Sequence, residues 1–148
     1  MKKNNEMSLT FLSLSENEAF ARVSVASFCS TINPTIDELS DIKTAVSEAV
    51  TNCVVHAYPN NVGKIKLDVK LITDEIYITV TDYGVGIGDI EKAKEPFYTT
   101  KPNAERSGMG FSVMEEFMDK VIVESKNGNG VKVTLIKKVG MCKLAVGG

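Results

Sequence analysis

The chain contains 148 residues with a formal net charge of −2, a length that predicts one domain able to bury a core without disulfides or metals. With 17 basic and 19 acidic residues, it lacks the bulk positive charge of many nucleic-acid binders. No stretch is apolar enough for a membrane span, and the apolar stretch after Lys3 is too short for a signal peptide. We therefore expect a cytoplasmic protein that contacts neither nucleic acid nor membrane directly.

The first part of the chain predicts a strand followed by a helix. Apolar and polar residues alternate at most positions of 7–14, which is the period of a half-buried strand. Ser15 and Glu18 fit a capping box, which favours a helix to about residue 30. Asn33-Pro34 then ends this helix.

A second helix and a hairpin come next. Thr35 and Glu38 fit another capping box, and the helix that they open is expected to run to about Ala57. Strict alternation of charged or polar with apolar residues over 63–72 and 75–82 predicts an antiparallel hairpin with one solvated face.

The last third of the chain predicts a long loop, a helix and another hairpin. Residues 84–107 contain Gly and Pro without strong periodicity, and a loop of this length is usually functional or mobile. A helix is expected near 108–118, and strands over 119–125 and 131–138 flank a turn at 127–130.

This order of elements predicts an α+β fold with a single domain over residues 1–148. It is a two-layer sandwich of a mostly antiparallel mixed sheet with helices on one face. Three cysteines (Cys29, Cys53 and Cys142) without a CxxC motif argue against a disulfide framework or a zinc site. We interpret the lone histidine, His56, as a structural residue.

The second helix is unusual on its polar side. Its apolar stripe consists of Leu39, Ile42, Val46, Ala49, Val50, Cys53 and Ala57. The opposite side carries Glu48 and Asn52 one turn apart, and residues 44–61 include no Lys or Arg. Two interpretations stay open: a weakly charged surface, or a pocket in which Glu48 accepts a proton and the Asn52 oxygen binds a hard cation such as Mg²⁺.

Two glycine segments suggest close approach of the backbone to a ligand. Asp82 precedes the alternating glycines Gly84 and Gly86, where the carboxylate either accepts a hydrogen bond from an amine or caps a turn. Gly108 and Gly110 open a predicted helix, a position suited to anions. Lys101 and Arg106 lie in or next to the preceding loop, and we interpret them either as phosphate contacts or as solvated basic residues.

The order of these motifs over about residues 35–137 resembles the GHKL (Bergerat-type) ATP-binding fold. A narrower resemblance covers nearly the whole chain. Ser47-Glu48-Ala49-Val50-Thr51-Asn52 with His56-Ala57-Tyr58, together with the segments 95–102 and 106–111, resembles the anti-sigma-factor serine kinases. Among these kinases, the chain most closely resembles the sporulation branch that controls sigma F.

The resemblance implies a role for each site residue. It makes Glu48 the catalytic base, Asn52 a Mg²⁺ ligand in the ATP site and Asp82 the acceptor for the adenine amine. The remaining implied positions are Gly84 and Gly86 in the base pocket, Thr99, Thr100, Lys101 and Arg106 in an ATP lid over about 89–107, Gly108 and Gly110 at the phosphates, and Arg22 as a partner contact.

The resemblance thus implies an ATP- and Mg²⁺-dependent protein serine kinase that is also an inhibitor. It would sequester sigma F and phosphorylate a serine of an anti-anti-sigma factor. We also expect a homodimer, because an apolar edge strand at 7–14 would otherwise be left open. The alternatives are a histidine-kinase-type catalytic domain and a non-catalytic, nucleotide-gated binding module.

Overall fold

The computed structural model describes residues 4–85, 110–125 and 130–140. Its elements are β1 (Asn5–Leu12), α1 (Asn17–Cys29), a 3-10 turn (Ser30–Ile32), α2 (Ile36–Asn52), a π-helical turn (Cys53–Ala57), β2 (Lys64–Ile72), β3 (Glu75–Asp82), α4 (Gly110–Phe117), β4 (Lys120–Ser125) and β5 (Val131–Lys138). Within these ranges no helix is both long and apolar enough to cross a membrane.

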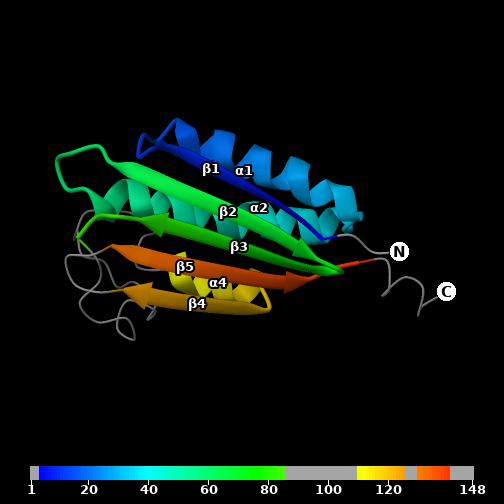
Figure 1. The fold of residues 1–148 in the computed structure, drawn as a ribbon. Helices are drawn as coiled ribbons and strands as arrows, with labels where there is room; N and C mark the ends of the chain where they lie inside the picture. Colours follow the sequence, from blue (N-terminus) through cyan, green and yellow to red (C-terminus); the bar gives the residue numbers. More distant parts are fainter. Residues whose placement is uncertain (1–3, 86–109, 126–129, 141–148) are drawn as a thin grey trace.

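The strands form one antiparallel sheet in the order β1-β2-β3-β5-β4, and the helices cover one of its faces (Figure 1). The predicted α+β sandwich and the order of its elements are therefore confirmed. β1 and β4 form the two edges, so the expected position of the first strand at an edge is also confirmed.

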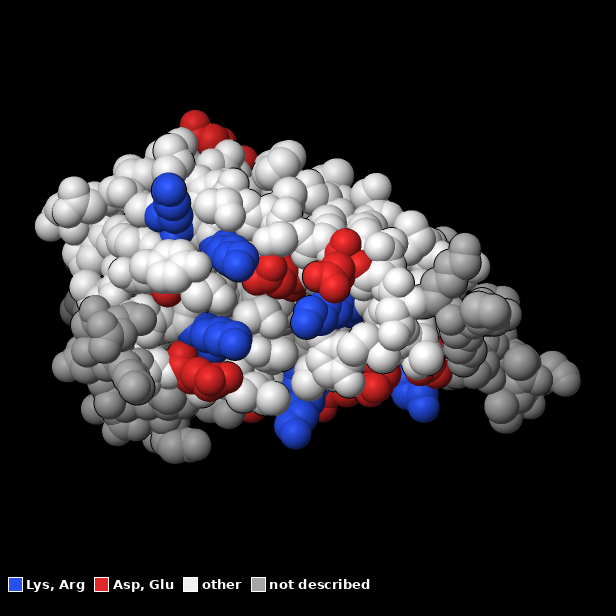
Figure 2. All heavy atoms as spheres, in the orientation of Figure 1, with Lys and Arg blue, Asp and Glu red and all other residues white. Residues whose placement is uncertain are grey.

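The β2–β3 hairpin lies inside the sheet, between β1 and β5, and its two faces differ in polarity. The apolar residues on its inner face are fully buried beneath the helices: Ile65, Leu67, Val69, Leu71, Ile76, Ile78 and Val80. Intervening polar residues lie on the other face, where Figure 2 shows Lys and acidic side chains interspersed. The turn between the strands places Thr73 at φ 54°, a left-handed conformation that is uncommon outside glycine.

Two expectations at the N-terminus are wrong. The capping box of Ser15 and Glu18 does not form, because α1 begins at Asn17 with Glu16 as its N-cap and no side-chain cap bond. The Glu18 carboxylate instead accepts a hydrogen bond from Arg22 Nε at 2.9 Å. β1 also begins and ends two residues earlier than the interval 7–14 predicts, since its register is set by pairing with β2.

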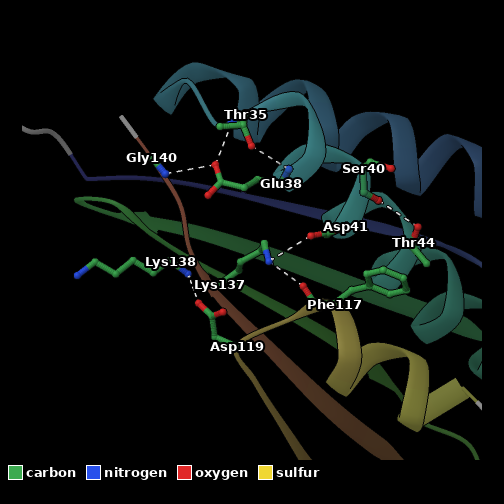
Figure 3. A network of polar contacts seen from close by, with 10 residues as sticks. All are labelled: Thr35, Glu38, Ser40, Asp41, Thr44, Phe117, Asp119, Lys137, Lys138 and Gly140. Atoms are coloured by element: carbon green, nitrogen blue, oxygen red, sulfur yellow. Dashed lines mark hydrogen bonds and ion pairs between the residues drawn. The ribbon is translucent and has the colours of Figure 1, made fainter. Parts of the chain in front are cut away.

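At the opposite end of the sheet from Asp82, a polar network joins β5 to α2 and α4 (Figure 3). Lys137 occupies a core-facing position of β5 and is only 8% exposed. Its ammonium donates to the carbonyl of Phe117 at the end of α4 (2.8 Å) and lies 3.5 Å from the Asp41 carboxylate of α2. The predicted capping box of Thr35 and Glu38 is confirmed there.

Lys137→Met is expected to lower the free energy of unfolding by about 1–3 kcal/mol, because it leaves the Phe117 carbonyl without its donor. The matched control is Lys138→Met. That side chain is 59% exposed and lies 3.9 Å from Asp74, so its loss should change stability by about 0.5 kcal/mol or less. Urea denaturation of both variants checks the difference, and equal effects would contradict it.

Candidate functional site

The side of α2 that lacks basic residues is buried at Ala45 and Glu48 and partly buried at Asn52. Ala45 is fully buried and Glu48 is 7% exposed, although both lie opposite the apolar stripe of the helix. α4 packs against α2. Of the two interpretations of this side, the burial of Glu48 argues against the weakly charged surface, and it leaves Glu48 as a carboxyl group in a protected environment.

Asn52, one turn after Glu48, carries the clearest sign of a ligand. Its carboxamide Nδ2 and Oδ1 are both buried, and neither has a hydrogen-bond partner among the described residues. Buried polar side chains normally find partners, and an unsatisfied one costs about 1–3 kcal/mol. A carboxamide oxygen is a hard ligand of the kind that Mg²⁺ accepts, so the residue fits the expected metal.

The first residue of α4 lies directly against this carboxamide. A Cβ atom added at Gly110 would be 2.7 Å from Asn52 Nδ2 and 3.1 Å from Oδ1. Only glycine permits such an approach without displacement of Asn52. The structure therefore brings together the end of α2 and the start of α4, two segments that the β2–β3 hairpin and residues 83–109 separate in the sequence.

Asp82 ends β3 and is 4% exposed. Its Oδ1 accepts hydrogen bonds from the backbone N–H groups of Gly84 (3.0 Å) and Val131 (3.2 Å). Burial raises the pKa of the carboxyl above its usual value, and these bonds oppose that shift because they favour the charged form. An ionised carboxylate has about four acceptor positions, so the group retains capacity for a further donor.

Cys53 connects the end of α2 with the end of β3. Its thiol is buried, and the pKa of the thiol is raised first by burial and then by the negative charge of the Asp82 carboxylate. Since Cys53 directly follows Asn52, the two polar residues singled out from separate motifs lie at the same end of the molecule. In Figure 1 this is the end at which the β3 arrow terminates.

Several predicted site residues lie outside the described residues: Gly86, Thr99, Thr100, Lys101, Arg106 and Gly108, with the expected lid over 89–107. Gly84 is described, and it packs against the carbonyl of Ala57. Arg22 lies on α1 in an ion pair with Glu18, with its side chain 39% exposed. His56 lies partly buried in the π-helical turn.

Sequence reasoning missed three neighbours of Asp82. The sequence pattern places Cys53 in the core and Val131 in a strand, and it gives Tyr58 only as part of a motif. The sequence around each of these residues gives little sign of a role, because each residue acts through a contact with a distant segment of the chain. The position of Cys53 directly after Asn52 is the one local clue.

Comparison with protein families matches residues 11–137 to a model described as a histidine kinase-like ATPase domain. The chain belongs to the histidine kinase-like ATPase family. This confirms the GHKL resemblance and implies ATP binding.

Curated relatives support the narrower resemblance. A protein named anti-sigma F factor from Clostridium beijerinckii is 54% identical over 91% of this chain and 95% of its own length. A protein of the same name from Clostridium botulinum (strain Eklund 17B / Type B) is 56% identical over 90% of this chain and 94% of its own length. Another, from Bacillus velezensis, is 51% identical over 94% of this chain and 96% of its own length. The resemblance to anti-sigma factors is therefore confirmed at the level of family.

Two solved structures share the fold. The RsbU and RsbW domains of Rv1364c from Mycobacterium tuberculosis match with a TM-score of 0.66 and 18% identity, over 91% of this chain and 32% of that one. The catalytic domain of histidine kinase ThkA matches with a TM-score of 0.57 and 22% identity, over 90% of this chain and 96% of that one.

Asn52→Leu is expected to leave the stability of the ligand-free protein unchanged or to raise it by up to about 3 kcal/mol. Leucine has nearly the same shape and removes two buried polar atoms that lack partners. Thr51→Leu, on the preceding residue of α2, controls for the general effect of leucine. Thermal and urea unfolding measure both variants. Marked destabilisation by Asn52→Leu alone would mean that the carboxamide is bonded in the ligand-free fold.

Proposed function

We propose that this chain is a cytoplasmic anti-sigma factor and an MgATP-dependent protein serine kinase. It sequesters a sporulation sigma factor (sigma F) and inactivates an anti-anti-sigma factor by phosphorylating one of its serines. The names of the relatives support the first activity, and membership of the ATPase family supports nucleotide use. The observation that carries the kinase proposal is the buried Asn52 carboxamide, which has no hydrogen-bond partner among the described residues and lies one turn from the buried Glu48.

Glu48 is the proposed general base. As the serine oxygen bonds to the γ-phosphorus and the bond to the leaving ADP oxygen breaks, Glu48 takes the hydroxyl proton. Asn52 would hold Mg²⁺ through Oδ1. A bound Mg²⁺ offsets the charge of the phosphates, where positioning and electrostatics supply most of the catalysis. Gly110 lets the start of α4 approach this place closely.

Asp82 is the proposed acceptor for the 6-amino group of adenine, and Gly84 would form part of the base pocket. Gly86, Thr99, Thr100, Lys101, Arg106 and Gly108 keep the base-pocket, lid and phosphate roles that the resemblance implies. Arg22 lies on α1 with its side chain 39% exposed, and it remains the proposed partner contact. A homodimer through β1 is supported by the position of that strand at the edge of the sheet.

The protein incubated with γ-labelled ATP and an anti-anti-sigma factor should transfer an acid-stable phosphate to that antagonist. A serine phosphoester survives acid, whereas phosphohistidine does not. Glu48→Gln should bind MgATP normally and slow single-turnover transfer by about 10²–10⁴-fold, the usual contribution of a general base. Asn52→Ala should slow transfer as well, and unlike Glu48→Gln it should weaken Mg²⁺-dependent ATP binding.

Acid-labile label, or label on His56 of this chain, would favour the histidine-kinase alternative. ATP binding without any transfer would favour the nucleotide-gated module. Wild-type transfer rates in Glu48→Gln would overturn the assignment of the base.

ATP affinity should fall as the pH is lowered through the raised pKa of Asp82, because only the ionised carboxylate accepts strongly from the adenine amine. The loss should therefore begin at a higher pH than the ordinary aspartate value of 3.8 predicts. Asp82→Asn should bind ATP more weakly at neutral pH and lack this part of the pH dependence. Calorimetry of both proteins at each pH cancels the titration of ATP itself, and parallel profiles would refute the role of Asp82.

A further inference from the structure

The segment that follows Asp82 is attached to the residues after α2 by two hydrogen bonds, in which its backbone N–H groups are the donors. The N–H of Tyr83 donates to the hydroxyl of Tyr58 (2.8 Å), and the N–H of Val85 donates to the carbonyl of Ala57 (2.9 Å). Ala57 ends the π-helical turn, and Tyr58 follows it. We call these four residues, together with Gly84, the α2–β3 clamp.

The Tyr58 hydroxyl also anchors the clamp to β2. It donates to the carbonyl of Lys64 at 2.6 Å while it accepts from Tyr83. One hydroxyl thereby bridges the start of β2 and the residue after β3. Its ring lies against Gly63, where an added Cβ would be 2.3 Å from two ring carbons. The position of the ring is therefore fixed by contact as well as by hydrogen bonds.

The clamp leaves little space for movement of the backbone after Asp82. A Cβ at Gly84 would lie 1.9 Å from the carbonyl oxygen of Ala57. A π-helical turn is uncommon and frequently marks a functional position. Here the turn includes Ala57, whose carbonyl accepts from Val85.

The orientation of the Asp82 carboxylate depends on this segment. Asp82 still pairs with Ile65 of β2, but the pairing of β3 with β5 ends one residue earlier, at Thr81. One of the two backbone donors to its Oδ1 is the N–H of Gly84, which lies within the clamp. Displacement of the clamp would move that donor and turn the carboxylate.

We propose that Tyr58 is a positioning residue that sets the selectivity of the site for a purine bearing a 6-amino group. It acts through the backbone of Tyr83 and Gly84 on Asp82, and it has no contact with the nucleotide itself. This inference rests on the proposed function, because it takes Asp82 as the acceptor for the adenine amine. The consequence is specific: loss of the Tyr58 hydroxyl removes recognition of the amine and spares the rest of nucleotide binding.

Tyr58→Phe keeps the ring against Gly63 and deletes only the hydroxyl. Calorimetry measures the affinities of wild type and variant for ATP and for purine riboside triphosphate, which lacks the 6-amino group. The preference of wild type for ATP should fall about tenfold in Tyr58→Phe, as expected for the loss of one charged hydrogen bond. Affinity for the purine analogue should stay the same. Tyr77→Phe, which deletes a hydroxyl bonded to Glu75 (3.0 Å), is the control and should keep the wild-type preference.

An unchanged preference in folded Tyr58→Phe overturns the inference, and so does an equal loss for both nucleotides. If Tyr58→Phe does not fold, Val85→Pro removes the other hydrogen bond of the clamp, and an unchanged preference in that variant overturns the inference instead. If wild type itself shows no preference for ATP, the proposed role of Asp82 fails together with the inference. The wild-type measurement therefore separates the two failures.

Discussion

A carboxylate that is almost fully buried needs hydrogen-bond donors, and this need at Asp82 determines how the rest of the site is assembled. The donors come from two separate segments: Gly84 after β3 and Val131 at the start of β5. The negative charge of the same carboxylate raises the pKa of the buried Cys53 thiol, directly after α2. Each donor holds its own segment against the end of β3. Asn52 is placed by the same arrangement, since it immediately precedes Cys53, and Gly110 of α4 then packs on Asn52.

Most of the fold could be predicted because its signals are local. The alternation over β2 and β3 reflects one buried and one solvated face, and the structure places these strands within one residue of the expected bounds. One error occurred where a distant partner decides the outcome, because the register of β1 depends on β2. The other error is a competition between two local contacts: Glu18 pairs with Arg22, four residues along α1, instead of completing a capping box with Ser15.

The candidate site was predictable in part for a similar reason. The absence of basic residues along one side of α2 is a property of a single helix. It marked that side as unusual, but only the structure shows that Glu48 is buried. The contact of Asn52 with Gly110, and the lack of a hydrogen-bond partner for its carboxamide in the part of the chain that the structure describes, depend on how α4 packs against α2. No local pattern encodes that packing, and the same holds for the bond between Tyr58 and Tyr83.

The two buried cysteines have a chemical consequence of their own. Alkylating reagents attack the thiolate, and burial keeps both groups protonated, with the pKa of Cys29 raised to about 12 and that of Cys53 raised as well. Modification of either thiol therefore requires the fold to open. Cys29 reports separation of α1 from the core, whereas Cys53 reports separation of α2 from Asp82. Among the described residues, Cys29 and Cys53 are thus two natural reporters that distinguish general unfolding from opening of the site.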